Sequence, residues 1–308
     1  MVSGHMGYDD SEKTTSGNAA MKAQATETRT QQIKQFALES GADVVGIADP
    51  RAWDEHVPEG HRPYDILPGA RSVVVVGSRG PTAGAWRSPN HRVIEVNGYD
   101  FRNDAAIHRV ADVIEMQYDY QAIQAPGLPT SGHLPPLSMM LAAVLAGLGT
   151  RSLAANIILN PKYGLLYYSA CITTFKFDYD RMLEQDVCPH HMCVESYRRF
   201  GKTPCMAACP SDEGGCLDGA IDADGRIEYS YYDRERCVSR AMNFGINSFQ
   251  KALAQIVAEE DTDRQATMIH SDFFSRSCSA ITHYKESVAQ CFECMRVCPI
   301  GRAERKLQ

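Results

Sequence analysis

The stretch Cys291-Phe-Glu-Cys294-Met-Arg-Val-Cys298-Pro299, near the C-terminus, carries three cysteines in the spacing C-x2-C-x3-C-P. Cysteine thiolates this close together suit soft metals, and sulfur around iron needs no other type of side chain. A second group lies upstream, where Cys205-Met-Ala-Ala-Cys209-Pro210 repeats the C-x3-C-P ending. The chain therefore predicts a pair of sulfur-ligated metal sites.

The C-terminal spacing closely resembles the second half of a bacterial two-cluster ferredoxin. In that pattern the cysteine before the proline ligates the other cluster, so each half needs a partner. The alternative is a structural zinc knuckle, which also uses C-x2-C. Two matching C-P endings favour iron–sulfur clusters over zinc, and any function must then use electrons.

The swapped-ligand rule of these ferredoxins divides eight cysteines into two sets of four. The first set is Cys188, Cys193, Cys205 and Cys298, and the second set is Cys209, Cys237, Cys291 and Cys294. The first set departs from the usual compact run, because residues 194–204 separate two of its members. Cys216 is therefore an alternative ligand in place of Cys188 or Cys193.

Four further side chains near these sets have simpler interpretations. Cys171 and Cys278 are left over, and a left-over cysteine is usually a small buried hydrophobe. His190 and His191 lie between two of the expected ligands. They can coordinate metal, but we expect solvent-facing or supporting roles instead.

The composition of the 308-residue chain limits what kind of protein it can be. With 44% hydrophobic residues, it can bury a full core and hold more than one domain. A net charge of -7 argues against a broad electrostatic footprint for tRNA or DNA, although it leaves room for a local basic groove. Eleven cysteines without an apolar leader indicate metal ligands in a reducing compartment. No apolar run reaches about 18 residues, so we expect a cytoplasmic protein without a membrane span.

Hydrophobic periodicity divides the chain into three regions. Residues 1–28 are polar and predict a disordered tail. Residues 29–182 alternate helical and strand patterns, which predicts a layered α/β (α+β) domain. Its clearest strand is Ser72-Val-Val-Val-Val-Gly77, a run typical of burial on both faces. Residues 78–103 look irregular and predict a pocket loop that holds aromatic and polar groups.

Residues 183–308 form the cysteine-rich second module. It contains a predicted helical insert over about residues 240–285. Within the insert, Phe249, Leu253 and Ile256 repeat at helical spacing and should share one face.

Four stretches, in this order, resemble one known superfamily: Leu67 to Gly77, Ala142 to Gly149, Leu159 to Gly164 and the cysteine pattern. Together they span residues 30–302. They resemble the cobalamin-dependent reductases, which comprise epoxyqueuosine reductase and the catalytic core of reductive dehalogenases. The resemblance implies a nitroreductase-like layered domain that holds a base-off corrinoid, followed by a bacterial two-cluster ferredoxin-like module.

The resemblance also nominates residues around the cofactor. The corrinoid-binding candidates are Gly147, Leu148, Gly149, Asn160, Tyr163 and Gly164. Glycine lets the backbone approach a corrinoid closely, and the alternative at Gly147 is a simple helix stop.

At the position of the proton donor that the resemblance implies, this chain has a different residue. Epoxyqueuosine reductases carry a proposed donor aspartate where this chain has His133, which can donate a proton near neutral pH or merely cap a loop. Reductive dehalogenases use a tyrosine, for which Tyr99 is the candidate here. Further candidates are Tyr118, Tyr120, Tyr163, Tyr167 and Tyr168, although most aromatic residues in such segments simply pack in the core.

The leading hypothesis is a cytoplasmic corrinoid-dependent reductase. Electrons from an external donor such as ferredoxin or flavodoxin would pass through two 4Fe–4S clusters to cobalamin, which reduces a small organic substrate such as an organohalide. An epoxyqueuosine reductase acting on tRNA is second, because the aspartate is missing and the charge is acidic. The third hypothesis is an FMN-dependent reductase on the same fold, and the fourth is an electron-transfer or corrinoid-handling protein.

Overall fold

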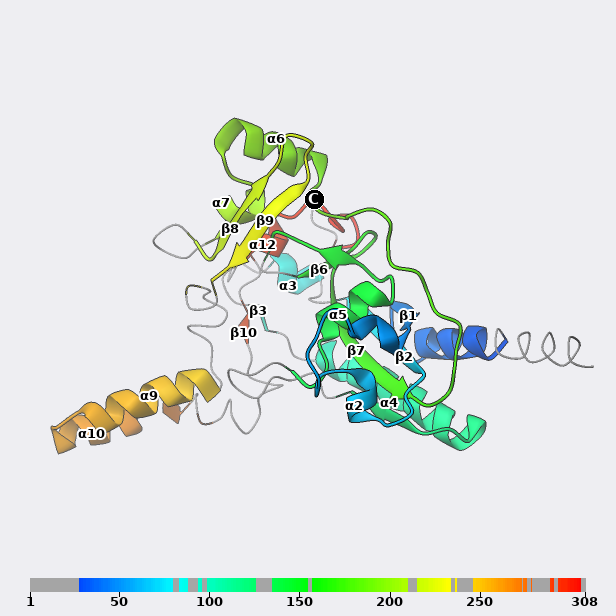
Figure 1. The fold of residues 1–308 in the computed structure, drawn as a ribbon. Coiled ribbons are helices and arrows are strands. Elements are labelled where there is room, and N and C mark those ends of the chain that lie inside the picture. The colour runs from blue at the N-terminus through cyan, green and yellow to red at the C-terminus, as the bar shows by residue number, and fades with distance from the viewer. Residues whose placement is uncertain are drawn as a thin grey trace, which may run out of the picture.

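The fold is mixed α/β, with a sheet-centred part beside a cysteine-rich part (Figure 1). The computed structural model describes residues 28–79, 83–87, 94–95, 99–125, 135–154, 157–209, 215–233, 236, 246–272, 274–275, 278, 289–290 and 293–305. Three predicted site residues, His133, Cys237 and Cys291, lie outside the described residues, as does almost all of the predicted N-terminal tail.

A six-stranded antiparallel sheet organises the N-terminal part. Its strands are β1 (Val44–Ala48), β2 (Ser72–Arg79), β4 (Ala122–Gln124), β5 (Thr150–Arg151), β6 (Ile158–Asn160) and β7 (Gly164–Thr173). The order is β1-β2-β7-β6-β5, and β4 also pairs with β7. β7 is the central strand, because β2 covers one of its edges while β6 and β4 share the other.

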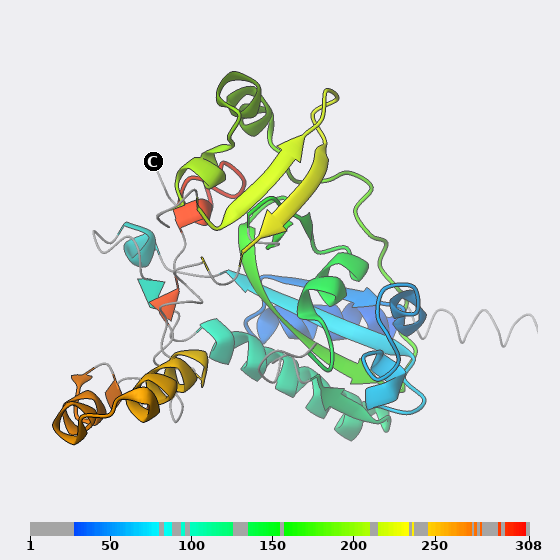
Figure 2. The same ribbon diagram turned by 60° about the vertical axis from the view of Figure 1, so that its left-hand side comes forward.

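Helices cover both faces of this sheet (Figure 2). They are the helix over residues 28–39, η1 (Pro50–Trp53), α2 (Pro63–Ile66), α4 (Tyr99–Tyr118) and α5 (Met139–Leu145), whereas α3 (Ala83–Arg87) lies beside the cysteine-rich part. Val73 and Val75 of β2 pack in the core with α5, whereas Val74 and Val76 pack in the opposite core with α4. The predicted burial of β2 on both faces is therefore confirmed.

The prediction that residues 78–103 form an irregular pocket loop is partly wrong. This stretch contains α3, the short strand β3 (Ile94–Glu95) and the start of α4, so the catalytic candidate Tyr99 begins a helix. Trp86 on α3 is only 2% exposed, because it packs into a core with the cysteines.

The cysteine-rich part is built from short elements. They are α6 (His191–Phe200), α7 (Pro204–Ala207), β8 (Leu217–Ile221), β9 (Ile227–Tyr232), α9 (Ile246–Ala258), α10 (Thr262–Ile269), β10 (Ala289–Gln290) and α12 (Glu293–Arg296). β8 and β9 form an antiparallel hairpin, and β10 pairs with β3. α7 carries Cys205 and α12 carries Cys294, and these two helices contact each other. The two cysteine motifs, distant in sequence, therefore meet in space.

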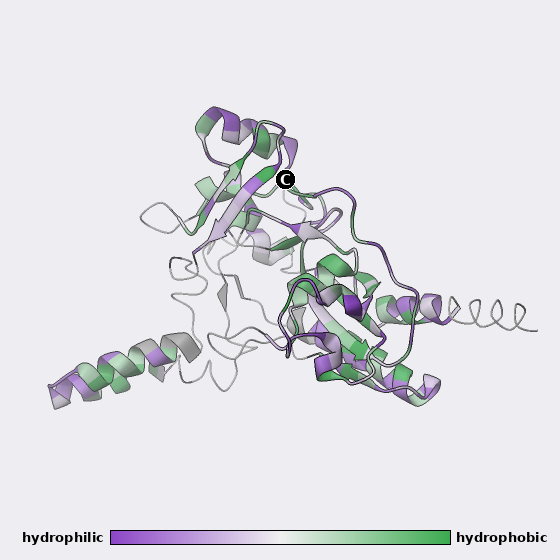
Figure 3. Cartoon of the chain, in the orientation of Figure 1, coloured by the Kyte–Doolittle hydropathy of each residue, from purple (hydrophilic) through white to green (hydrophobic). Residues whose placement is uncertain are grey.

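Helices α9 and α10 extend away from the sheet (Figure 1) and mix apolar and polar residues (Figure 3). On α9, Ile256 is 7% exposed but Leu253 is 42% exposed, so the predicted apolar face is only partly covered. Among the described residues, no helix is long and apolar enough to cross a membrane.

A third core joins the sheet to the cysteine-rich part. Its buried members include Leu153, Leu159 and Leu165 from around β5, β6 and β7, together with Met206 and Met295. Cys188, Cys205, Cys216 and Cys298 belong to the same core. The cysteines are therefore packed against one end of the sheet.

Candidate metal centre

Four buried cysteines from distant parts of the chain gather in this region. Cys188 precedes α6, Cys193 lies on α6, Cys205 lies on α7 and Cys298 follows α12. The Cys188 thiol interacts electrostatically with the other three, and the Cys193 thiol with Cys205 and Cys298. We call these four residues the first cysteine group, and they are the set that the swapped-ligand rule assigns to the first cluster.

Burial keeps these thiols protonated when no metal is present. It raises the pKa of the Cys188 and Cys193 thiols to about 12. Burial also raises the pKa of the Cys205 and Cys298 thiols. Because only the thiolate binds metal, a metal ion bound here would have to displace the protons. The group therefore suits a metal centre and not a free nucleophilic thiolate at neutral pH.

A backbone N–H faces each of the four sulfurs. The donors are Leu153 to Cys188, His190 to Cys193, Met206 to Cys205, and Ile300 to Cys298. Each lowers the pKa of its thiol against the larger effect of burial, because a hydrogen bond to sulfur favours the thiolate. The Thr203 hydroxyl also lies 3.1 Å from the Cys205 sulfur. Hydrogen bonds to the sulfurs are among the factors that set the potential of an iron–sulfur cluster.

The donor set fits an iron–sulfur cluster by its chemistry. Thiolate sulfur alone can complete the coordination of each iron atom. In the part of the chain that the structure describes, no group of three or more His, Cys, Asp and Glu side chains is placed to hold a metal ion. A 4Fe–4S core holds its thiolates further apart than one ion does, because iron and sulfide atoms lie between them.

Two residues predicted for the second cluster, Cys209 and Cys294, are half-buried and pack against the same core. The Cys216 sulfur lies 3.3 Å from the Cys209 sulfur, and the Cys216 N–H donates to that sulfur at 3.1 Å. Gly215 precedes this contact with a φ of +90°, and a Cβ there would lie 3.2 Å from the Cys209 Cβ. Cys216 thus lies beside a predicted ligand of the second cluster, whereas the sequence suggested it as a substitute in the first.

Cys171 lies on β7 and is fully buried in a core on the sheet. Burial raises the pKa of its thiol to about 12, so it is the small buried hydrophobe that the sequence predicts. His190 caps α6, where its Nδ1 accepts the Met192 N–H at 3.3 Å. Its ring lies 4.0 Å from that of His191.

Three of the predicted corrinoid-binding residues are glycines with close backbone contacts. Gly147 ends α5 with a φ of +70°, and a Cβ there would lie 2.2 Å from the Arg181 carbonyl oxygen. A Cβ on Gly149 would lie 2.5 Å from the Leu159 oxygen, and one on Gly164 would lie 2.5 Å from the Ile300 oxygen. The space in front of each glycine is therefore filled by this chain.

Asn160, which is also predicted to bind the corrinoid, forms hydrogen bonds with the backbone of the same segments. Its Nδ2 donates to the Leu148 carbonyl at 2.8 Å. Its Oδ1 accepts the N–H groups of Lys162 and Tyr163, each at 3.0 Å. Contacts within the chain account for the three glycines and Asn160, and the contact of all six predicted residues with a corrinoid stays a prediction.

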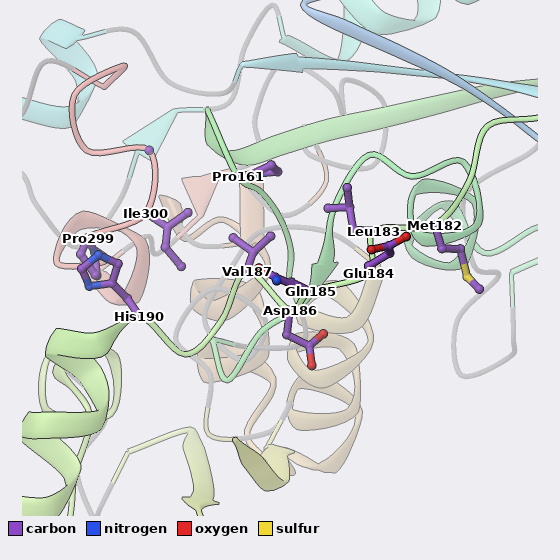
Figure 4. A pocket seen from close by; sticks show the side chains of 11 residues that line it. Pro161, Met182, Leu183, Glu184, Gln185, Asp186, Val187, His190, Pro299 and Ile300 are labelled. Atoms are coloured by element: carbon purple, nitrogen blue, oxygen red, sulfur yellow. The ribbon is translucent and has the colours of Figure 1, made fainter. Parts of the chain in front are cut away.

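A pocket of about 740 Å³ opens beside the first cysteine group. Residues 182–187 line one side, and His190 and residues 299–301 line the other (Figure 4). These segments flank Cys188 and Cys298 in the sequence. The pocket therefore lies next to the segments that carry Cys188 and Cys298, and neither cysteine lines it.

Trp86 and Arg305 are buried beside the cysteines. The sequence predicted Trp86 only as an aromatic group of the pocket loop, and it gave no role to Arg305. Arg305 follows Cys298 by seven residues, and its only sequence signal is that proximity. An arginine near a chain end is usually exposed, so the signal is weak.

Comparisons with known proteins bear on the fold. No family model matches the chain, and no curated protein matches it. An epoxyqueuosine reductase structure from Streptococcus thermophilus matches at 16% identity and a TM-score of 0.51, covering 88% of this chain and 66% of that chain. An epoxyqueuosine reductase bound to a modified tRNA-Tyr stem loop matches at 18% identity and a TM-score of 0.50, covering 89% and 66%. This chain shares their fold.

The resemblance to this reductase superfamily is thereby confirmed at the level of the fold. A structure of a reductive dehalogenase, described with B12-dependent dehalogenation, matches at 18% identity with a TM-score of 0.49, covering 82% of this chain and 36% of that chain. The chain thus spans about two thirds of the epoxyqueuosine reductases and a smaller share of the dehalogenase.

Proposed function

We propose that this chain is an iron–sulfur oxidoreductase of the cobalamin-dependent reductase type. One observation carries the proposal: four buried thiols, each facing a backbone N–H, gather on the fold of the epoxyqueuosine reductases. The first cysteine group would hold one 4Fe–4S cluster. Cys209, Cys237, Cys291 and Cys294 would hold the other, in a ferredoxin-like arrangement.

The residues of the chain bind the clusters and keep water away from them. Leu153, Met206 and Met295 cover the first cysteine group, and Trp86 closes the same core. When bound, clusters carry single electrons and a corrinoid supplies a reducing metal centre. The corrinoid is proposed from the fold, and we assign none of its contacts to the glycines that pack against the chain. His133 and Tyr99 remain the candidates for holding the proton that a reduced substrate takes up.

A small organic molecule is the leading substrate class. The net charge of -7 opposes broad contact with a polyanion. His133 also replaces the proposed donor aspartate of the epoxyqueuosine reductases, so the chemistry at this position differs. The external electron donor would be a small redox protein such as ferredoxin or flavodoxin.

Reduction of epoxyqueuosine in tRNA is the second candidate. It is favoured by the fold comparison, because the neighbours with a TM-score of 0.50 or more include a complex with a modified tRNA stem loop. The queuosine content of tRNA in a deletion strain tests it. Unchanged queuosine excludes this candidate and leaves the small-molecule substrate.

Spectroscopy of anaerobically purified, reconstituted protein tests the cofactors. We expect the broad visible absorption of iron–sulfur clusters, and base-off corrinoid bands after cobalamin is added. Flavin bands without cobalamin uptake would support the FMN-dependent reductase and refute the corrinoid. Cobalamin reduction without turnover of any substrate would favour an electron-transfer or corrinoid-handling protein. Protein that holds zinc and no iron would refute all of these.

A cysteine substitution tests the ligand sets. Cys294→Ala should lose one cluster, and therefore about half of the bound iron, because each cluster uses four cysteines. Cys171→Ala is the control and should keep all of the iron, since Cys171 is buried in the sheet. Full iron in Cys294→Ala, measured by metal analysis, would contradict the assignment.

A further inference from the structure

Arg305 is a buried cation at the edge of the first cysteine group. Its side chain is 6% exposed, and its Cζ lies 5.4 Å from the centroid of the Trp86 ring. Nη1 donates to the Ile300 carbonyl at 2.8 Å, and Nη2 donates to the Cys298 carbonyl. The guanidinium is therefore held against the backbone of the loop that presents the Cys298 sulfur.

Among the described residues, no carboxylate side chain balances the charge of Arg305. Within the residues that the structure describes, no Asp or Glu pairs with it, and its Nε is buried without a hydrogen-bond partner. Burying a guanidinium with only neutral acceptors is costly. The guanidinium instead donates to the carbonyl of Cys298, a member of the first cysteine group. Thiolates bound to a cluster at that group would supply the missing negative charge.

The position of Arg305 is built by distant elements of the fold. Gly164, at the start of β7, makes room for it, because a Cβ there would lie 2.9 Å from the Arg305 Nη1. Trp86, on α3, covers the guanidinium. A charge held in this way, away from water, acts more strongly on its neighbours than an exposed charge does.

We propose that Arg305 is the counter-charge of the first iron–sulfur cluster and raises the reduction potential of that cluster. The inference rests on the proposed function. Four thiolates around a 4Fe–4S core leave a net negative charge, and reduction adds one electron without adding a proton. A buried cation stabilises the more negative, reduced state more strongly. Arg305 thus acts on the cluster through its charge, and the first cluster is easier to reduce with Arg305 present than without it.

A potentiometric titration followed by electron paramagnetic resonance tests this on the reconstituted protein, with dithionite as reductant. Arg305→Gln should lower the equilibrium constant for reduction of one cluster about tenfold, which moves its midpoint by about 59 mV to a more negative potential. The signal that moves should be the one that Cys193→Ala abolishes. The other signal should keep its midpoint.

Arg302→Gln is the matched control. It removes the same charge three residues earlier, at an exposed position where water screens it. Both midpoints should therefore stay at their wild-type values. An equal shift in Arg302→Gln would overturn the inference, because burial would then play no part. Wild-type midpoints in an Arg305→Gln protein that holds both clusters would also overturn it.

Arg305→Lys separates charge from packing. It keeps the cation but loses the planar guanidinium, so the cluster should load and keep a midpoint near the wild-type value. This variant decides the matter if Arg305→Gln fails to assemble the first cluster. Loss of the same cluster from Arg305→Lys would show that the carbonyl contacts matter and the charge does not. Wild-type protein that binds no iron would instead refute the proposed function, and this inference with it.

Discussion

The sheet-centred part and the cysteine-rich part are stabilised by different kinds of core. Both faces of the sheet are packed with aliphatic and aromatic side chains, whose removal from water is favourable by itself. The third core instead buries thiols and the guanidinium of Arg305. Burying such groups is favourable only when their charges are compensated. The comparison indicates that the sheet is stabilised by its own apolar side chains. If the first cysteine group holds a cluster as proposed, the stability of the cysteine core will depend on the bound metal.

Removing the iron should have the largest effect and should separate the two parts. Without iron, the thiols lose their metal partners and Arg305 loses its counter-charge. Hydrogen exchange of the chelated protein should show lost protection over residues 188–209 and 293–305. β2 and α4 should stay protected, because their core contains no cysteine ligand. Equal loss of protection in both parts would contradict the comparison.

A glycine substitution should have an intermediate effect, at the contact between the parts. Gly301 has a φ of +69°, and a Cβ there would lie 2.2 Å from the Tyr163 carbonyl oxygen. Gly201 has a similar φ of +67° but open space around it. Gly201→Ala should cost about 1–2 kcal/mol from backbone strain. Gly301→Ala should cost about 1–3 kcal/mol more, because the new methyl group also overpacks the contact.

Denaturant unfolding of the iron-loaded variants measures this difference. Equal losses in the free energy of unfolding would show that the close approach between Gly301 and Tyr163 contributes nothing. The two parts would then not be joined by a tight contact at Gly301.

The smallest effect on stability is expected at Cys216. In iron-free protein, diamide should take two electrons and two protons from the Cys209 and Cys216 thiols and join them. The sulfurs are 3.3 Å apart in the fold, and only residues 210–215 separate the two cysteines, so they stay close even when the surrounding core loosens. Bound iron should block the reaction by occupying Cys209. Mass spectrometry of peptides detects the disulfide, and Cys216→Ser should abolish it while leaving the unfolding free energy nearly unchanged. A disulfide from Cys216 to Cys188 or Cys193 would instead support the assignment of Cys216 to the first cluster.

The features that the sequence predicts well are local ones. The valine run of β2 specifies a strand buried on both faces, since every side chain in it is apolar. The helix stop at Gly147 follows from the conformational freedom of glycine. One long-range feature was also predicted: the swapped pattern of ferredoxins grouped Cys188 and Cys193 with Cys298, and the fold brings these residues together, while their binding of a cluster stays a prediction.

The features that the sequence did not predict depend on contacts between distant residues. Trp86 lies in a stretch with no clear periodicity, and only the fold brings it to Arg305, more than 200 residues later. The sequence suggested Cys216 for the first cysteine group because the spacing of that group is irregular. In the fold, however, the Cys216 sulfur lies beside that of Cys209. The corrinoid role of Gly164 was drawn from a resemblance, whereas its observed contact is with Ile300. No local pattern encodes such pairs.

The close contact between Gly301 and Tyr163 has a consequence for the maturation of the protein. During synthesis, Cys188, Cys193 and Cys205 leave the ribosome well before Cys298. A nascent chain therefore presents three ligands of the first cysteine group without the fourth. A protein that delivers preformed clusters would meet an incomplete site until the segment around Gly301 docks against Tyr163. If the first cysteine group holds a cluster as proposed, that cluster can be completed only after this C-terminal segment has been made and has docked.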